Sequence, residues 1–300
     1  MTTGTVEGEF IATMDDPDDP EMFERNRIHT NAGAQEYGFQ GAFVGGVTLY
    51  AWCIPTVIEA LGEEWLDHGW VNIRFRRPTY PGARIRVRVR PKEDSPSCVL
   101  EACQDDGQAS IVGEVGLGTA PWLGDLRETP FSAPDLDGPD LAGPALGGPD
   151  LDGPDLDGTD RPFLTLENAP IGQPLRTYGY GQHTPAPPAV GQKLAEVIEL
   201  ATPTGAVVHP ATLAREMIAL LTNSYDYGHP SIHLTSHVQN FARIPAGTDV
   251  VLCGTFVDAF ERNGHHNAVI DADLYSLDGQ RLARQRHANI FKVRRAREAD

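Results

Sequence analysis

The sequence predicts an α+β protein made of two similar halves, each with one long helix wrapped by a curved antiparallel sheet. Three observations predict this fold: a length of 300 residues, a stretch rich in Pro, Gly and Asp near the middle, and the same order of elements on either side of that stretch. At about 150 residues a domain, the length accommodates two such halves. A chain of this size buries a large core without disulfides or metals.

The composition restricts the class of partner. The chain has 24 Lys and Arg against 42 Asp and Glu, a formal net charge of −18. Nucleic-acid binding needs a basic face, so we expect no nucleic-acid partner. No apolar run approaches the ~18 residues of a membrane span, and the opening MTTGTVEGEF lacks the features of a signal peptide. The four cysteines form no CxxC pair, so we expect them to be reduced thiols. We therefore expect a cytoplasmic protein without membrane contact.

The middle of the chain is a pentapeptide repeat. Five units of the type PDLDG follow one another over residues 134–158. Pro fixes φ and Gly loosens it in every unit, so neither helix nor strand propagates, and one Leu a unit does not offset the ordering entropy. We therefore predict an N-terminal half over residues 1–130, a disordered linker over 131–162 and a C-terminal half over 163–300. A ligand surface built from the repeats is the alternative.

The first half has one helical pattern followed by strand patterns. Apolar residues recur at steps of three and four over residues 46–61, which predicts a long buried helix. Pro55 lies inside this pattern and is expected to kink or break the helix. A turn is expected at 67–69. Alternating or apolar runs then predict strands at 71–78, 84–90, 98–103 and 110–118.

The second half repeats this order. A helical pattern covers residues 207–225, with Pro210 suited to its first turn. Placing Pro81-Gly82 over Ala246-Gly247 brings the two helix starts into register, which indicates a duplicated scaffold. Chance similarity of two unrelated α+β domains is the alternative. Strand patterns follow the helix at 232–241, 248–257, 267–276 and 281–293.

The stretch FERNRIH, residues 23–29, precedes Gly38-Phe39 and Gly45-Gly46. In this order it resembles the signature of the MaoC-like (R)-specific enoyl-thioester hydratases and dehydratases, a hotdog-fold family. Glu24 stands at the family's Asp, Asn26 at its Asn and His29 at its His. The resemblance covers roughly residues 10–120 and implies a double hotdog fold.

Three positions depart from the family signature. Glu24 replaces Asp, which keeps the charge and adds a methylene, and Arg27 replaces Pro between the Asn and the His. Gly45 replaces the His that precedes the helix glycine in the family. The spacing from carboxylate to imidazole is unchanged.

The resemblance implies a hydro-lyase acting on 2-enoyl or 3-hydroxyacyl thioesters of CoA or a carrier protein. Glu24 and His29 would hold one water as an acid/base pair, and Asn26 would orient the water or the carboxylate. The amide of Gly46, at the start of the helix, would stabilise the enolate oxygen. Gly45 and Phe39 are expected at the substrate. We expect no metal, no cofactor and a homodimer.

A basic cluster is the second candidate binding feature. Arg74, Arg76 and Arg77 precede the arginine-rich strand at 84–90. Guanidinium groups suit phosphate oxygens, so these three are candidates for contact with CoA or a phosphopantetheine arm. A solvated strand face is the alternative.

The second half lacks the signature before His209, so we expect it to form a wall of the acyl pocket. Asp226, His229, His233 and His237 lie where they could line that pocket. Two other functions stay open: a hotdog thioesterase, with Glu24 activating water against the thioester carbonyl, and a non-catalytic subunit that binds acyl thioesters. Taken singly, Glu24, Asn26 and His29 also suit a cap, a turn and a loop histidine.

Overall fold

The predicted strands of both halves pair into one sheet. The computed structural model describes residues 4–14, 16–18, 26–132, 161–175, 178–180, 199–228 and 230–295. Glu24, His229 and residues 133–160 of the predicted linker lie outside these ranges. No helix in the described ranges is both long and apolar enough to cross a membrane.

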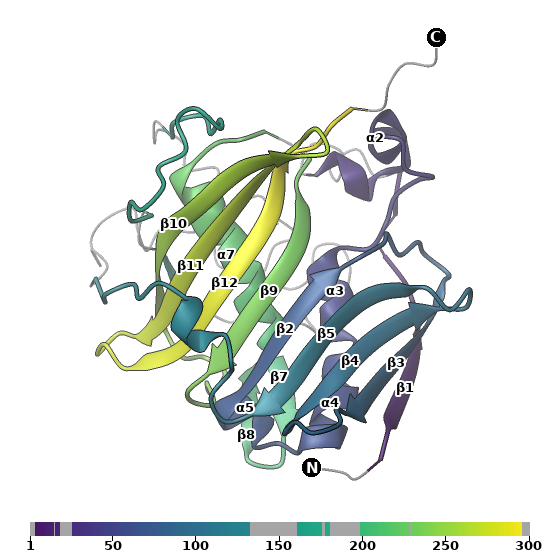
Figure 1. Ribbon diagram of the computed structural model, residues 1–300, viewed down its shortest axis with the longest axis vertical. Coiled ribbons are helices and arrows are strands. Elements are labelled where there is room, and N and C mark those ends of the chain that lie inside the picture. The colour runs from purple at the N-terminus through teal and green to yellow at the C-terminus, as the bar shows by residue number, and fades with distance from the viewer. Residues whose placement is uncertain are drawn as a thin grey trace.

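Ten antiparallel strands form the main sheet, and its two ends have the same topology (Figure 1). The order is β1-β3-β4-β5-β2 followed by β9-β12-β11-β10-β6. The second half therefore has the first half's strand order, with β6, β9, β10, β11 and β12 in the places of β1 to β5. The first-half strands are β1 (Val6–Ile11), β2 (Gly69–Phe75), β3 (Arg84–Pro91), β4 (Ser97–Gln104) and β5 (Ala109–Leu117). Those of the second half are β6 (Tyr178–Tyr180), β9 (Ile232–Asn240), β10 (Val250–Arg262), β11 (His265–Ser276) and β12 (Arg281–Lys292).

The halves join where β2 pairs with β9, with Ile73 opposite Ser236. Gly82 and Gly247 precede β3 and β10 with φ of 85° and 83°, a left-handed conformation that favours glycine. The two turns thus have the same geometry in the register that aligns the halves. A separate hairpin of β7 (Glu199–Thr202) and β8 (Gly205–Val208) precedes the second-half helix.

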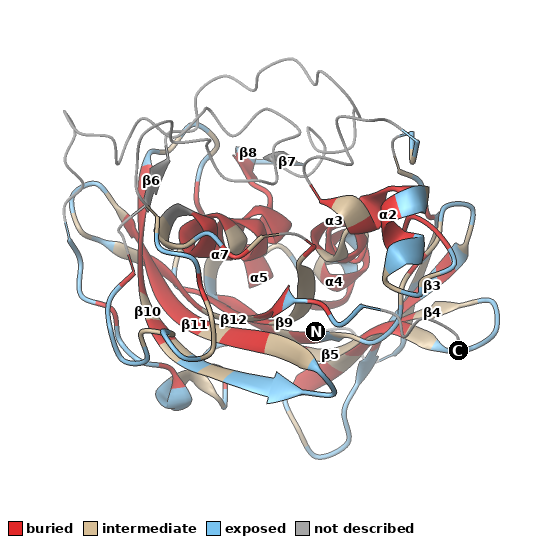
Figure 2. Cartoon of the chain, turned by 90° about the horizontal axis from the view of Figure 1, so that it is seen from above, coloured by how far each residue is buried: buried red, intermediate tan, exposed pale blue. Residues whose placement is uncertain are grey.

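The helices lie against the concave face of the sheet, and buried residues fill the space between them (Figure 2). In the first half these are α3 (Gly46–Ala51), α4 (Ile54–Leu61) and α5 (Trp65–His68); in the second, α7 (Pro210–Ser224). The short helices η1 (Arg27–His29), α2 (Asn31–Glu36) and η2 (Leu123–Asp125) lie outside this layer of central helices.

The first-half helix differs from one continuous segment. It breaks between α3 and α4, and Pro55 lies in the first turn of α4, as the missing amide of proline requires. The turn expected at 67–69 is wrong, because residues 65–68 form α5 and Gly69 begins β2. Trp65 packs against this junction: a Cβ at Gly69 would clash with its ring, and its Nε1 donates to the carbonyl of Trp70 at 3.2 Å.

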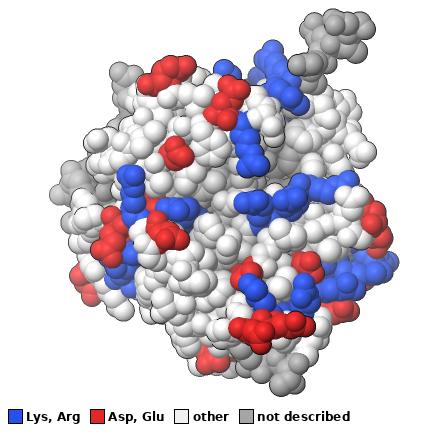
Figure 3. Space-filling model, in the orientation of Figure 1, with Lys and Arg blue, Asp and Glu red and all other residues white. Residues whose placement is uncertain are grey.

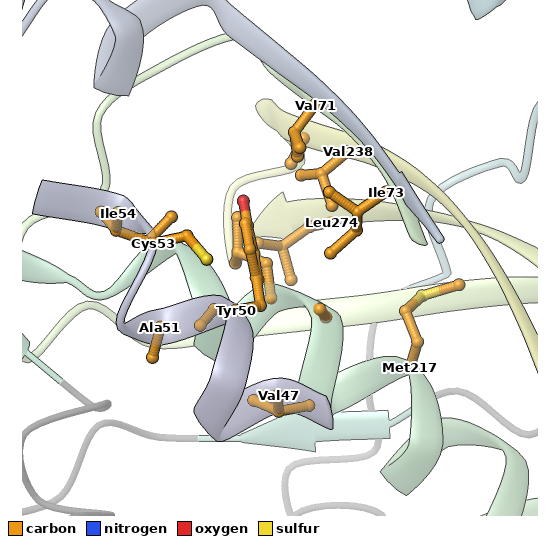
Figure 4. Close-up of a cluster of buried hydrophobic side chains, with 14 of the residues drawn as sticks. Val47, Tyr50, Ala51, Cys53, Ile54, Val71, Ile73, Met217, Val238 and Leu274 are labelled. Carbon is orange, nitrogen blue, oxygen red and sulfur yellow. The ribbon is translucent and has the colours of Figure 1, made fainter. Parts of the chain in front are cut away.

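One apolar core spans both halves. Tyr50 of α3 is fully buried in a cluster with Val71 and Val238 of the sheet, Met217 of α7 and Leu274 of β11 (Figure 4). Burial of this apolar surface stabilises the contact between the halves as well as each half. The core therefore holds α3 and α7 at fixed positions beside each other.

Candidate active site

A cavity of about 350 Å³ lies between the two halves and is lined from both. The first half contributes η1, the loop before α3, the start of α3 and the end of β2, and the second half contributes α7 and the start of β9. Most of the lining is apolar, including Phe43, Phe75 and Ile218. The residues predicted from the sequence that line the cavity are Asn26, His29, Phe39, Gly45, Gly46, Arg76, Arg77 and His233.

His29 is held by its own backbone and by the loop before α3. It ends η1, where its amide donates to the carbonyl of Asn26 at 2.9 Å. Its side chain is buried, and Nδ1 lies 2.7 Å from the carbonyl oxygen of Phe43. A carbonyl only accepts, so Nδ1 carries the proton and Nε2 is left as an acceptor. Burial lowers the pKa of His29, and the Phe43 carbonyl opposes this only in part.

Asn26 enters the cavity from the residue before η1. Its extended backbone, with φ of −145°, begins the turn that carries His29. Its Nδ2 donates to the carbonyl of Ser231, at 3.4 Å, from the other half. Its Oδ1 is buried and has no hydrogen-bond partner among the described residues. Both residues line the cavity, so Oδ1 of Asn26 and Nε2 of His29 are its candidate acceptors for a bound water.

Two glycines bring the helix start close to these groups. Gly46 is the first residue of α3, so its N–H has no acceptor within the helix. A Cβ at Gly46 would lie 3.1 Å from the ring of Phe75, whereas one at Gly45 would lie 3.7 Å from Cε1 of His29. The backbone at Gly46 therefore packs against Phe75, and the imidazole lies beside Gly45.

The predicted basic cluster divides between two surfaces. Arg76 and Arg77 follow β2 and line the cavity, and Arg77 pairs with Asp106 at 3.0 Å. Arg74 lies within β2, is exposed, and does not line the cavity. The arginines of β3 pair with acidic residues of neighbouring strands, as Arg84 does with Glu9 at 2.9 Å, and in Figure 3 positive and negative groups lie side by side on this face. The β3 arginines thus form a solvated, charge-paired face.

The second half supplies the rest of the wall. His233 lines the cavity, whereas Asp226 and His237 do not, and His237 instead packs on Trp122 with ring centroids 5.0 Å apart. The sequence analysis did not predict Arg215. The sequence signal for it is a charged side chain within the apolar pattern of α7. The other polar lining residues of this half are Thr222, Tyr227, Ser231 and His265.

No family model matches this sequence, and no curated protein matches it. Solved structures do. A protein of Chloroflexus aurantiacus described as a MaoC-domain dehydratase is similar with a TM-score of 0.56 and 10% identity, over 98% of this chain and 96% of the other. A conserved hypothetical protein of Mycobacterium tuberculosis described as having a double hotdog fold is similar with a TM-score of 0.55 and 11% identity, over 97% of this chain and 96% of the other. A protein of Lactobacillus plantarum described as an oleoyl thioesterase is similar with a TM-score of 0.47 and 11% identity, over 96% of each chain.

At these identities the likeness concerns the fold. The fold of this chain agrees with that likeness, because the second half repeats the strand order of the first and central helices cover each half of the sheet. The chain has a double hotdog fold.

Proposed function

We propose that the protein is a hydro-lyase that adds water to 2-enoyl thioesters or removes it from 3-hydroxyacyl thioesters of CoA or a carrier protein. The observation that carries this proposal is the bond from His29 to the carbonyl of Phe43. It leaves Nε2 as a proton acceptor in the cavity that Asn26 and Gly46 also line. Two acceptor-bearing side chains and a helix-start amide along one cavity suit a reaction that needs an activated water and a stabilised enolate.

In the hydration direction, the acid/base pair removes a proton from water as the water oxygen bonds to C3. The C2–C3 π electrons move toward the thioester carbonyl, whose oxygen gains negative charge and accepts from the Gly46 amide. The acid/base pair then delivers a proton to C2 as the enolate returns to the carbonyl. His29 Nε2 is one member of the pair, the Asn26 amide orients the water, and Glu24 is the second member by its place in the sequence. Dehydration follows the same steps in reverse.

The remaining lining gives the substrate its place. Phe39, Phe43 and Phe75 provide an apolar wall for the acyl group, and Phe39 and Phe43 pack with ring centroids 4.9 Å apart. Arg76 and Arg77 stand where the chain leaves β2, and we assign them to the phosphates of the carrier arm.

The test is the fate of crotonyl-CoA. Hydration removes the enoyl absorbance reversibly without releasing thiol. We expect His29→Ala and Glu24→Gln each to lower turnover by ~100-fold or more, because one acid/base group contributes about 100- to 10,000-fold. Unchanged thermal unfolding of the variants is the control for folding.

Two outcomes overturn the proposal. Free thiol appearing in step with substrate loss would identify a thioesterase. Binding of crotonyl-CoA with a turnover equal to that of His29→Ala would identify a non-catalytic binding subunit.

A further inference from the structure

The inner face of β12 is polar where the equivalent face of the first half is apolar. In the first half, Gly113 and Val115 of β5 lie opposite Ile73 and Val71 of β2. Aligning Gly82 on Gly247 places Val238 and Ser236 of β9 at the positions of Ile73 and Val71. These two residues pair with Gln285 and His287 of β12, which therefore take the places of Gly113 and Val115. The next residue on this face, beyond a bulge, is Asn289. We call Gln285, His287 and Asn289 the polar row.

The polar row lacks partners among the described residues. All three side chains are at most 2% exposed, and none of their side-chain N and O atoms has a hydrogen-bond partner in the described ranges. Each buried, unpaired polar group costs about 1–3 kcal/mol. Apolar residues, as in the first half, would avoid this cost. None of the three lines the cavity, so they form a polar layer behind its wall.

His233 connects the polar row to the cavity. It lines the cavity, its ring packs on Phe75 at 4.6 Å between centroids, and its other neighbour is His287 at 4.4 Å. Its Nε2 lies 2.7 Å from the hydroxyl of Ser236, while Nδ1 is buried without a described partner. His233 thus joins the cavity wall, which Phe75 also lines, to His287 of the polar row.

Arg215 brings a positive charge to the same cavity. It is 8% exposed and lines the cavity from α7, and its Nε and Nη2 contact a single oxygen, Oε1 of Glu216, at 3.1 and 3.0 Å. Glu216 is fully buried, and its Oε2 has no described partner. Burial raises the pKa of Glu216, although Arg215 opposes the shift. Nε and Nη2 share one oxygen of Glu216, so the guanidinium can take a second acceptor.

We propose that the acyl group of the substrate carries a carboxylate distal to the thioester, and that Arg215 binds it in the cavity that His233 also lines. This inference rests on the proposed acyl-thioester function of the same cavity. A carboxylate accepts from a guanidinium through two parallel bonds, which a methyl group does not replace. A site with buried donors rejects an analogue that lacks the acceptor, because those donors then stay unpaired.

The test compares glutaryl-CoA with pentanoyl-CoA by titration calorimetry, each as the analogue with a methylene in place of the thioester sulfur. The two acyl groups have the same number of carbons, but the glutaryl group ends in a carboxylate and the pentanoyl group in a methyl. Neither analogue is consumed by hydration or hydrolysis. We expect the glutaryl analogue to bind about 10- to 100-fold more tightly, the range of one charge-assisted hydrogen-bonded pair. Arg215→Met should bring the ratio of the two affinities close to one, and Arg215→Lys should keep part of it.

The control is Arg262→Met, an exposed arginine of β10 outside the cavity, which should leave the ratio unchanged. Equal binding of the two analogues to the unaltered protein, tighter binding of the pentanoyl analogue, or binding of neither overturns the inference. These outcomes are measured on the unaltered protein alone, so the test remains decisive even if Arg215→Met fails to fold.

The result is separable from the proposed function. If the glutaryl analogue binds preferentially but neither crotonyl-CoA nor glutaconyl-CoA is hydrated, the carboxylate site stands and the hydro-lyase proposal fails. If crotonyl-CoA is hydrated but the analogues bind equally, the hydro-lyase stands and the carboxylate site fails.

Discussion

His29 donates from Nδ1 to the carbonyl oxygen of Phe43 over 2.7 Å, and this bond determines which nitrogen of the imidazole is available to a substrate. With Nδ1 protonated, Nε2 has the lone pair. Burial favours the neutral ring, so the tautomer and the charge state both suit a proton acceptor.

The pH dependence of the reaction should follow from this burial. Because the pKa of His29 is lowered from 6.5, Nε2 stays able to accept a proton below pH 6.5. We expect kcat/KM for crotonyl-CoA hydration to fall only as the pH drops through that lowered pKa, measured from about pH 8 to about pH 4.5. A loss of rate already complete at pH 6.5 would contradict the assignment of His29 as the base.

The two glycines before and at the start of α3 form a matched pair of substitutions. Gly45→Ala places its Cβ at ordinary contact distance, 3.7 Å, from His29, whereas Gly46→Ala places it 3.1 Å from the ring of Phe75. We expect Gly45→Ala to keep most of the activity. Gly46→Ala should lower kcat by about 10- to 100-fold, because a shift near 1 Å at a reacting centre has that effect. Equal rates in both variants, measured on crotonyl-CoA, would show that the Gly46 backbone has no part in the reaction.

The N-terminus of α7 should make the fold sensitive to acid. His209 caps this helix by accepting the amide of Ala211 at Nδ1, and burial lowers its pKa from 6.5 to about 4. The unfolded chain binds a proton near pH 6.5 that the folded chain does not, so the free energy of unfolding falls as the pH drops below 6.5. The loss approaches roughly 3 kcal/mol at about pH 4, and no loss is expected above pH 6.5.

His209→Asn separates the cap from the charge. Asn caps a helix as well and does not titrate, so the variant should unfold at a similar urea concentration at about pH 7 and be less destabilised at about pH 5. His68→Asn, at an exposed histidine of α5, is the control and should leave the pH dependence as it was. An unchanged acid response in His209→Asn would assign the sensitivity to other buried groups.

A buried carboxylate should anchor the end of the first half to the second. Asp273 of β11 is fully buried and accepts from the amide and hydroxyl of Thr129, at 2.8 and 3.0 Å, and from Nε of Arg284 at 2.8 Å. Asp273→Ala leaves Arg284 without this partner, so we expect a loss of about 3–5 kcal/mol in urea unfolding. Asp258→Ala, at an exposed position of β10, should cost far less, and equal losses would show that the anchor contributes nothing specific.

The sequence by itself determined the two halves, their strands and the order of the site motif. Period-two and helical patterns are local, so the strands at 84–90 and 98–103 agree with β3 and β4 to within one residue at each end. Pro55 predicted the break between α3 and α4 because its ring and missing amide act within one turn. The Pro81-Gly82 turn aligned the two halves correctly because the geometry of a turn also depends on neighbouring residues in the sequence.

Tertiary structure decided which side chains meet. Alternation along β2 separates Arg74 on its exposed face from the cavity, and only the curvature and pairing of the sheet show where that cavity lies. Arg215 gains its place through the packing of α7 beside α3, far along the chain, and the tautomer of His29 depends on a carbonyl fourteen residues away. Such contacts join distant segments, and hydrophobic periodicity contains no information about which distant group a polar side chain will face.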